Sequence, residues 1–294
     1  MPIVCACRLL RPLFVVTVKA PLSADAGRAV DADKRGNAIG QGGGMLLEDK
    51  VAVVYGGGVI SRAVTSAFAR EGARVFLAGR NEARLQEIMA AIRAAGGSIE
   101  IARLDALDER AVRDHANAVA AAAGSVDISF NLISLGDVQG IPLPEMTLDE
   151  FERPVLTVLR STFLTSKAAA GHMMRQGSGV VLMFGGYGDP MPAHHLGGLQ
   201  VAFQALEAFR RTLASELGPY GIRVVTLQTA GIVDSIGNDF EGRDAIIGEI
   251  VERTMIKRAA TLEDVGNVAC FAASDWARTL TATAINMTCG TQVD

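Results

Sequence analysis

The chain has 294 residues, of which 49% are hydrophobic and 20% charged, so it contains enough apolar material to bury a core along most of its length. Its 28 basic and 32 acidic residues give a formal net charge of -4 and are spread along the chain, which leaves no basic stripe for a phosphate backbone. No apolar run approaches the roughly 18 residues that a membrane helix needs. We therefore expect neither nucleic acid nor a membrane as a partner.

The four cysteines indicate a reducing compartment. Cys5, Cys7, Cys270 and Cys289 form neither a CxxC pair nor a set with metal-ligand spacing. The sequence therefore predicts a cytoplasmic location and no metal site.

Residues 1–44 differ from the rest of the chain. Basic residues surround short apolar pieces there, and the segment ends in the glycine-rich stretch 40–44. A targeting leader fits part of this pattern, but Pro12 and Lys19 interrupt the apolar run. We expect a disordered extension over 1–44, with a leader as the alternative, and a folded domain over 45–294.

From residue 50 onward, short β-branched runs alternate with longer helical periods. Strands are predicted over 51–55, 74–78, 98–104, 127–132, 179–184, 222–228 and 283–287. Helices are predicted over 60–72, 81–95, 108–123, 148–175, 196–217, 241–253 and 261–274. This alternation predicts an α/β fold, a single domain with a Rossmann-type doubly wound parallel sheet covered by helices on both faces. The longer connections, 185–198 and 229–243, follow strand ends where such sheets bind ligands.

A glycine turn follows the first predicted strand. Gly56, Gly57 and Gly58 open the first helix, where a glycine backbone can approach a pyrophosphate held at the helix N-terminus. Arg80 follows the second strand, at the place where a ribose 2′-phosphate would lie. We expect NADP, with NAD possible; a plain tight turn and a solvent-exposed arginine are the alternatives.

Several segments in chain order carry a family resemblance. They are 55–62, 104–108, 126–131, 216–224 and 261–275. From about Leu47 to its end, the chain resembles the short-chain dehydrogenase/reductase family. The resemblance implies that Asp105 binds the adenine amino group, that Asn131 supports the strand beside the cofactor and that Ile60 lines the pyrophosphate turn. This turn is one residue short of the family pattern, and Ser61 replaces one of its later glycines.

The family's usual catalytic residues are an asparagine, a serine, and a tyrosine four positions before a lysine. Alignment on the matching segments puts these positions at Val158, Gly186, Leu199 and Phe203, none of which can move a proton. The enoyl-reductase spacing, with tyrosine seven positions before lysine, gives Leu196 and again Phe203. The chain is therefore predicted to be a divergent member that lacks the standard catalytic residues.

Two other side chains in the expected cleft can exchange a proton. Tyr187 stands one residue past the serine position, and His195 belongs to the pair His194–His195 before the next helix. A histidine can donate a proton near neutral pH, but adjacent side chains point in different directions, so we expect at most one to face a substrate. A cleft wall for Tyr187 and loop packing for the histidines are the alternatives.

Three functions remain open. The first is an oxidoreductase that transfers a hydride between NADP(H) and a small apolar carbonyl or alcohol with a non-standard proton donor, Tyr187 or His195. The others are a redox-inactive nucleotide-binding or regulatory protein and a non-redox cyclase or isomerase. The resemblance also implies a homodimer or homotetramer through the helices at 148–175 and 196–217. The acidic pairs Asp108–Glu109 and Asp149–Glu150 are expected to cap helices.

Overall fold

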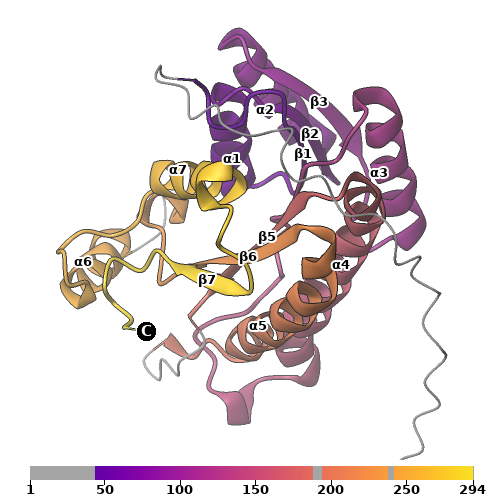
Figure 1. Ribbon diagram of the computed structural model, residues 1–294. Coiled ribbons are helices and arrows are strands. Elements are labelled where there is room, and N and C mark those ends of the chain that lie inside the picture. Colours follow the sequence, from indigo (N-terminus) through magenta and orange to yellow (C-terminus); the bar gives the residue numbers. More distant parts are fainter. Residues whose placement is uncertain (1–43, 188–193, 238–241, 294) are drawn as a thin grey trace, which may run out of the picture. The chain divides into compact units, whose positions relative to one another are not determined.

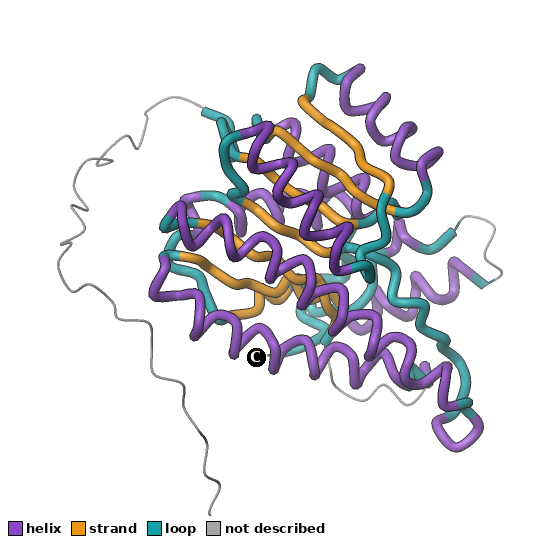
Figure 2. The backbone as a smooth tube through the Cα atoms, turned by 90° about the vertical axis from the view of Figure 1, so that its right-hand side faces the viewer, coloured by secondary structure: helices purple, strands orange, loops and turns teal. Residues whose placement is uncertain are grey.

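Seven parallel strands form one sheet with helices on both sides (Figures 1 and 2). The computed structural model describes residues 44–187, 194–237 and 242–293. In space the strands run β3-β2-β1-β4-β5-β6-β7, and each neighbouring pair is parallel. The order reverses beside β1, which makes the sheet doubly wound. The predicted fold class, a single Rossmann-type α/β domain, is confirmed.

The observed elements end within two residues of the predicted ones. The strands are β1 (Val51–Tyr55), β2 (Arg74–Gly79), β3 (Ser98–Arg103), β4 (Ile128–Asn131), β5 (Gly179–Gly186), β6 (Ile222–Thr229) and β7 (Thr283–Asn286). The α-helices are α1 (Val59–Arg70), α2 (Glu82–Ala94), α3 (Glu109–Ala123), α4 (Leu148–Gln176), α5 (Gly198–Leu217), α6 (Arg243–Arg253) and α7 (Leu262–Ala273).

The sheet buries apolar side chains on both faces. Along β1, Ala52 and Val54 enter the core beneath α1, α2 and α7. Val51, Val53 and Tyr55 enter the opposite core, beneath α3, α4 and α5. Because both faces are covered, the strands are mostly apolar, and the polar side chains Ser129 of β4 and Thr226 of β6 are buried as well.

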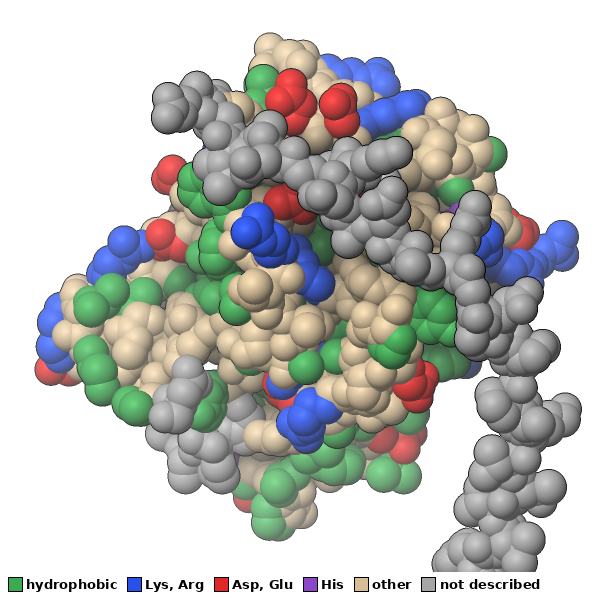
Figure 3. Space-filling model, viewed as in Figure 1, with side chains coloured by type: hydrophobic (Ala, Val, Ile, Leu, Met, Phe, Trp, Pro, Cys, Tyr) green, Lys and Arg blue, Asp and Glu red, His purple; other side chains and the backbone are tan. Residues whose placement is uncertain are grey.

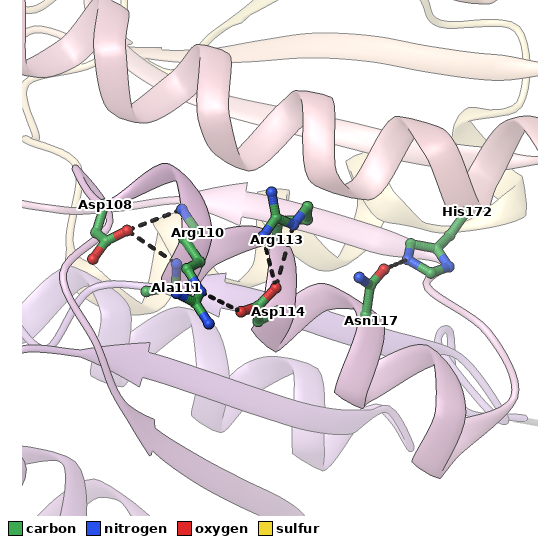
Figure 4. Close-up of polar contacts among 7 residues, drawn as sticks. All are labelled: Asp108, Arg110, Ala111, Arg113, Asp114, Asn117 and His172. Carbon is green, nitrogen blue, oxygen red and sulfur yellow. Dashed lines mark hydrogen bonds and ion pairs between the residues drawn. The ribbon is translucent and has the colours of Figure 1, made fainter.

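Acidic residues at helix starts act as caps. Asp108 accepts hydrogen bonds from the backbone amides of Arg110 (2.9 Å) and Ala111 (3.1 Å) at the start of α3 (Figure 4). At the start of α4, Glu150 accepts from the amide of Thr147 at 2.8 Å and Thr147 caps in return. These contacts satisfy amides that have no partner inside the helix, so both acidic pairs contribute caps as predicted.

The surface of the domain carries charges of both signs. On the face shown in Figure 3, basic and acidic side chains are interspersed. Within the described residues, no helix is long and apolar enough to cross a membrane, and no three His, Cys, Asp or Glu side chains gather as metal ligands. Residues 1–43 of the predicted extension lie outside the described residues, so its boundary stays a prediction.

Buried Tyr55 of β1 and half-buried His115 of α3 form an aromatic pair. Their ring centroids lie 5.7 Å apart in an edge-to-face arrangement. Burial lowers the pKa of His115 from its ordinary value of 6.5 to about 4, because desolvation disfavours the charged ring. Its Nδ1 atom has no hydrogen-bond partner in the described part of the chain.

This histidine makes the domain sensitive to acid. The unfolded chain takes up the proton near pH 6.5 but the folded chain only near pH 4, so the free energy of unfolding falls as the pH drops through this window. The loss approaches about 3 kcal/mol at pH 4. Urea unfolding of His115→Phe should show an acid loss smaller by that amount.

The matched control is His172→Gln on the surface of α4, where Nε2 lies 2.9 Å from Asn117 Oδ1 (Figure 4). This variant should keep most of the acid sensitivity. Equal acid loss in His115→Phe and the unmodified protein would show that His115 is not the titrating group.

Candidate active site

A cavity of about 530 Å³ opens at the carboxyl ends of β5 and β6. Both of the longer connections predicted from the sequence contribute to its lining. Its lining includes Gly186, Tyr187, His194, Leu196, Leu199, Phe203, Ile246, Glu249, Ile250 and Arg253. The size and the mixture of apolar walls with a few polar groups are typical of a small-molecule site.

Phe203 occupies the space beside Gly186. A Cβ atom on Gly186 would lie only 2.4 Å from Phe203 Cε2 and 2.9 Å from Phe203 Cδ2. Real Cβ contacts do not come so close, so a side chain at position 186 requires the ring to move. The two residues that the sequence alignment assigns to the family's serine and lysine positions, Gly186 and Phe203, therefore pack directly against each other in an apolar contact.

The wall around this contact is apolar. Leu199, at the tyrosine position, is 9% exposed and lines the cavity together with Leu196 and Phe203. Ile246 and Ile250 line it from α6. A Cβ atom on Gly231 would lie 3.2 Å from Ile250 Cδ1. The side chain of Ile250 on α6 therefore packs close to the backbone of Gly231, shortly after the end of β6.

Tyr187 is placed where it can reach a bound molecule. It follows the last residue of β5, is partly buried and lines the cavity. Its amide donates to Thr229 O at 3.3 Å, which fixes the backbone to the end of β6. Its hydroxyl donates to Val293 O at 3.4 Å, at the long end of the range for such a bond. The phenol is therefore held only weakly.

The two adjacent histidines point differently, and His194 is the one that lines the cavity. His195 is exposed, has a backbone φ of 44° and is not among the lining residues. The side chain singled out as a candidate proton donor thus lies outside the lining, while its neighbour lies inside it.

His194 lies beside a charged cluster that the sequence did not predict. His194 Nε2 lies 3.2 Å from Glu249 Oε1 and 3.2 Å from Arg253 Nη1. The ring can donate to the carboxylate or accept from the guanidinium, depending on its protonation. Glu249 and Arg253 are four residues apart on α6, and this spacing is too common on helix surfaces to mark a site from sequence.

The glycine turn lies at the same edge of the sheet. Gly56 has a φ of 141°, and a Cβ there would lie 2.5 Å from Leu132 O, so only glycine fits this contact. Ser61, fully buried, faces Gly56 from the first turn of α1. The short turn is therefore packed tightly on the inside.

The outer part of the same turn is open. Gly58 is exposed, and a Cβ there would meet nothing within 4 Å. It precedes α1 and, as a glycine, offers no side-chain cap to the first amides of the helix, near Ile60. Gly57 is partly buried beside Leu85. An uncapped helix start with open space before it fits a phosphate group.

Arg80 and Asp105 follow the ends of β2 and β3, at the same edge of the sheet as the glycine turn. A Cβ on Gly79, the last residue of β2, would be 3.4 Å from Gly56 O, and exposed Arg80 follows directly. Leu104 donates to Gly79 O at 3.0 Å, which places exposed Asp105 just after β3 at the same edge. Asp105 Oδ1 accepts the amide of Leu107 at 3.0 Å and leaves its other oxygen available.

Asn131 ties the central strand to α4. Its Nδ2 donates to Ser161 Oγ at 2.8 Å and to Thr162 Oγ1 at 3.1 Å. Val158, at the family's asparagine position, is 3% exposed one turn earlier on the same helix. Asn131 is thus fully engaged within the protein and positions the end of β4.

These features define a class of protein: a doubly wound nucleotide-binding domain with an open phosphate turn and a neighbouring small-molecule cavity. The family model described as Enoyl-(Acyl carrier protein) reductase matches residues 58–292. The chain belongs to the short-chain dehydrogenase/reductase family, whose members bind NAD(P) and act on small molecules.

Curated proteins and solved structures agree with this assignment. The chain is 30% identical to "Uncharacterized oxidoreductase YxbG" of Bacillus subtilis over 236 residues, which cover 78% of this chain and 86% of that protein. It is 28% identical to a 7alpha-hydroxysteroid dehydrogenase of Clostridium sardiniense, over 78% of this chain and 88% of that one. A dehydrogenase/reductase of Sinorhizobium meliloti 1021 superposes with a TM-score of 0.74 at 25% identity, covering 85% and 97% of the two chains.

The contact between Gly186 and Phe203 can be tested by a double-mutant cycle. Gly186→Ser should lower the free energy of unfolding by about 1–3 kcal/mol, because the new side chain overpacks the ring. Adding Phe203→Ala should remove most of that loss, so the two effects should be strongly non-additive. Urea unfolding of the two single variants and the double variant measures the coupling. Additive effects would contradict the packing described here.

Proposed function

We propose that the chain is an NADP(H)-dependent oxidoreductase that interconverts a small apolar carbonyl compound and its alcohol, with Tyr187 as the proton donor. The observation that carries this is the position of Tyr187 in an apolar cavity at the sheet edge that also bears the open glycine turn. A nicotinamide, when bound, supplies or accepts the hydride. In the reducing direction the carbonyl carbon gains that hydride, and the oxygen gains the phenol proton as the C=O double bond becomes single.

Tyr187 meets the requirements for this role better than His195. Its hydroxyl donates only one long hydrogen bond, to Val293 O, and breaking this bond frees it to reach a substrate. His195 is exposed beside the cavity, so it remains the second candidate. Leu199 and Phe203 exclude water and provide an apolar surface.

Arg80 supports NADP over NAD. Its guanidinium is exposed beside the glycine turn, and no hydrogen bond or ion pair engages its side chain within the described residues. A free guanidinium suits a 2′-phosphate, which it can bind through two parallel hydrogen bonds. Asp105 is exposed just after β3, at the same edge of the sheet, and can accept from an adenine amino group.

The predicted lack of the standard proton relay is the reason for considering a competing role. The direct packing of Phe203 on Gly186 suits a redox-inactive protein that retains the nucleotide site. A non-redox cyclase or isomerase would also use the apolar cavity. Turnover distinguishes the three, since only the proposed enzyme consumes NADPH in proportion to its product.

We also propose a homodimer or homotetramer in the cytoplasm. The outer faces of α4 and α5 expose Leu156 (58%), Phe163 (50%) and Val201 (44%). Exposed apolar residues on neighbouring helices are typical of subunit contacts. The compartment rests on cysteine usage: Cys270 and Cys289 form no disulfide among the described residues.

The role of Arg80 is tested by nucleotide binding. Arg80→Gln should weaken NADPH binding about tenfold to a hundredfold, because one charge-assisted contact to phosphate is lost. NADH binding should change little. Fluorescence titration measures both constants, with exposed Arg84→Gln on α2 as the control. Equal loss of NADPH and NADH affinity in Arg80→Gln would remove the proposed preference for NADP.

The proton donor is tested by steady-state kinetics. Tyr187→Phe keeps the ring and removes the hydroxyl, so kcat should fall about 10² to 10⁴-fold while NADPH affinity is retained. His195→Phe, assayed in parallel, identifies the donor if the loss falls there instead. Bound NADPH that is oxidised no faster than in buffer across a broad carbonyl panel would overturn the proposed function.

A further inference from the structure

Helix α6 faces the cavity with two adjacent stripes of different character. Ile246 and Ile250 form an apolar stripe and Glu249 and Arg253 a charged one, each with a spacing of four residues, and all four line the cavity. No residue of α6 is buried, and Figure 1 shows the helix at the periphery of the domain, outside the layers that cover the sheet. A molecule bound in the cavity would therefore bury more of the surface of Ile246 and Ile250.

The charged stripe has unused hydrogen-bonding capacity. Arg253 Nη1 lies 3.2 Å from His194 Nε2 and 4.0 Å from Glu249 Oε1. Its Nε and Nη2 groups have no partner within the described residues, and its side chain is 39% exposed. These two groups form one edge of the guanidinium, the edge that matches the two oxygens of a carboxylate.

The charges beside Arg253 permit such an anion. Glu249 opposes it, but this carboxylate already lies next to both His194 and Arg253 and is half exposed, so solvent screens part of the repulsion. Gln139 and Gln292 are the uncharged amide side chains of the same lining. The cluster therefore has one permanent cation with a free edge and one carboxylate that is already paired.

We propose that the substrate of this site is an amphipathic carboxylate, whose apolar chain packs between α5 and α6 and whose carboxylate binds the free edge of Arg253. This rests on the proposed function and changes its substrate from a wholly apolar carbonyl compound to one that carries a carboxylate at the end of its apolar chain. Leu199 and Phe203 face the chain from α5, while Ile246 and Ile250 face it from α6. A cavity of about 530 Å³ lies within the range for small-molecule sites, roughly 300–1,000 Å³.

The test compares straight-chain keto acids of increasing length with their methyl esters, which keep the chain and lose the charge. Calorimetry on NADP-saturated protein measures binding without any turnover. The acid should bind about tenfold or more tightly than its ester, as expected for one charge-assisted contact. Arg253→Gln should abolish this preference, and Arg253→Lys should retain part of it because an ammonium is not bidentate.

Two further variants sharpen the result. Glu249→Gln should raise the affinity for the acid and leave the ester unchanged, since it removes the opposing charge. Lys257→Gln removes a positive charge just after α6 that pairs with Glu252 and does not line the cavity; the preference for the acid should survive in it. Equal binding of acid and ester by the unmodified protein, or a preference that persists in Arg253→Gln, would overturn the proposal.

Failure of the proposed function looks different. If the acid binds through Arg253 but NADPH is not consumed, the carboxylate site stands and the oxidoreductase does not. If esters and acids bind and react equally, the oxidoreductase stands and the carboxylate site does not.

Discussion

The close approach of Gly56 to Leu132 is the contact on which the nucleotide half of the structure depends. The amide of Leu132 donates to Tyr55 O at 2.7 Å, and a Cβ on Gly56 would lie 2.5 Å from Leu132 O. The ends of β1 and β4 can therefore meet only with glycine at this position. Since β1 and β4 flank the point where the winding of the sheet reverses, this contact also places the open turn where such sheets bind ligands.

The cavity depends on a second contact of the same kind. Gly186 lacks a side chain and Phe203 fills the space, so the two residues are matched in volume. Replacing only one of them with the family's usual polar residue leaves either a clash or a gap. Phe203 and Gly186 therefore form part of the same cavity wall as Tyr187, which directly follows the glycine.

Helix α6 completes the site without belonging to the core. It buries none of its residues, yet four of its side chains line the cavity. An element held by so few internal contacts has a low cost of local rearrangement. A ligand that packs against Ile246 and Ile250 and binds Arg253 would add the contacts that the helix lacks, so substrate binding and the placement of α6 are coupled.

The sequence by itself determined the elements and the sheet edge. Within the described residues, alternating strands and helices predicted each strand and each α-helix to within two residues, because burial on both faces makes parallel strands recognisable as apolar runs. The glycine turn and Arg80 were predicted as cofactor-binding residues from their positions after strands, since carboxyl ends of parallel strands share one edge, and Asp105 was predicted from the family resemblance. Only the tertiary structure decided which of two adjacent histidines lines the cavity and that Phe203 fills the space at Gly186. It also decided that Glu249 and Arg253 lie beside His194. The sequence could not predict this contact, because residues more than 50 positions apart meet through packing and leave no local pattern in the chain.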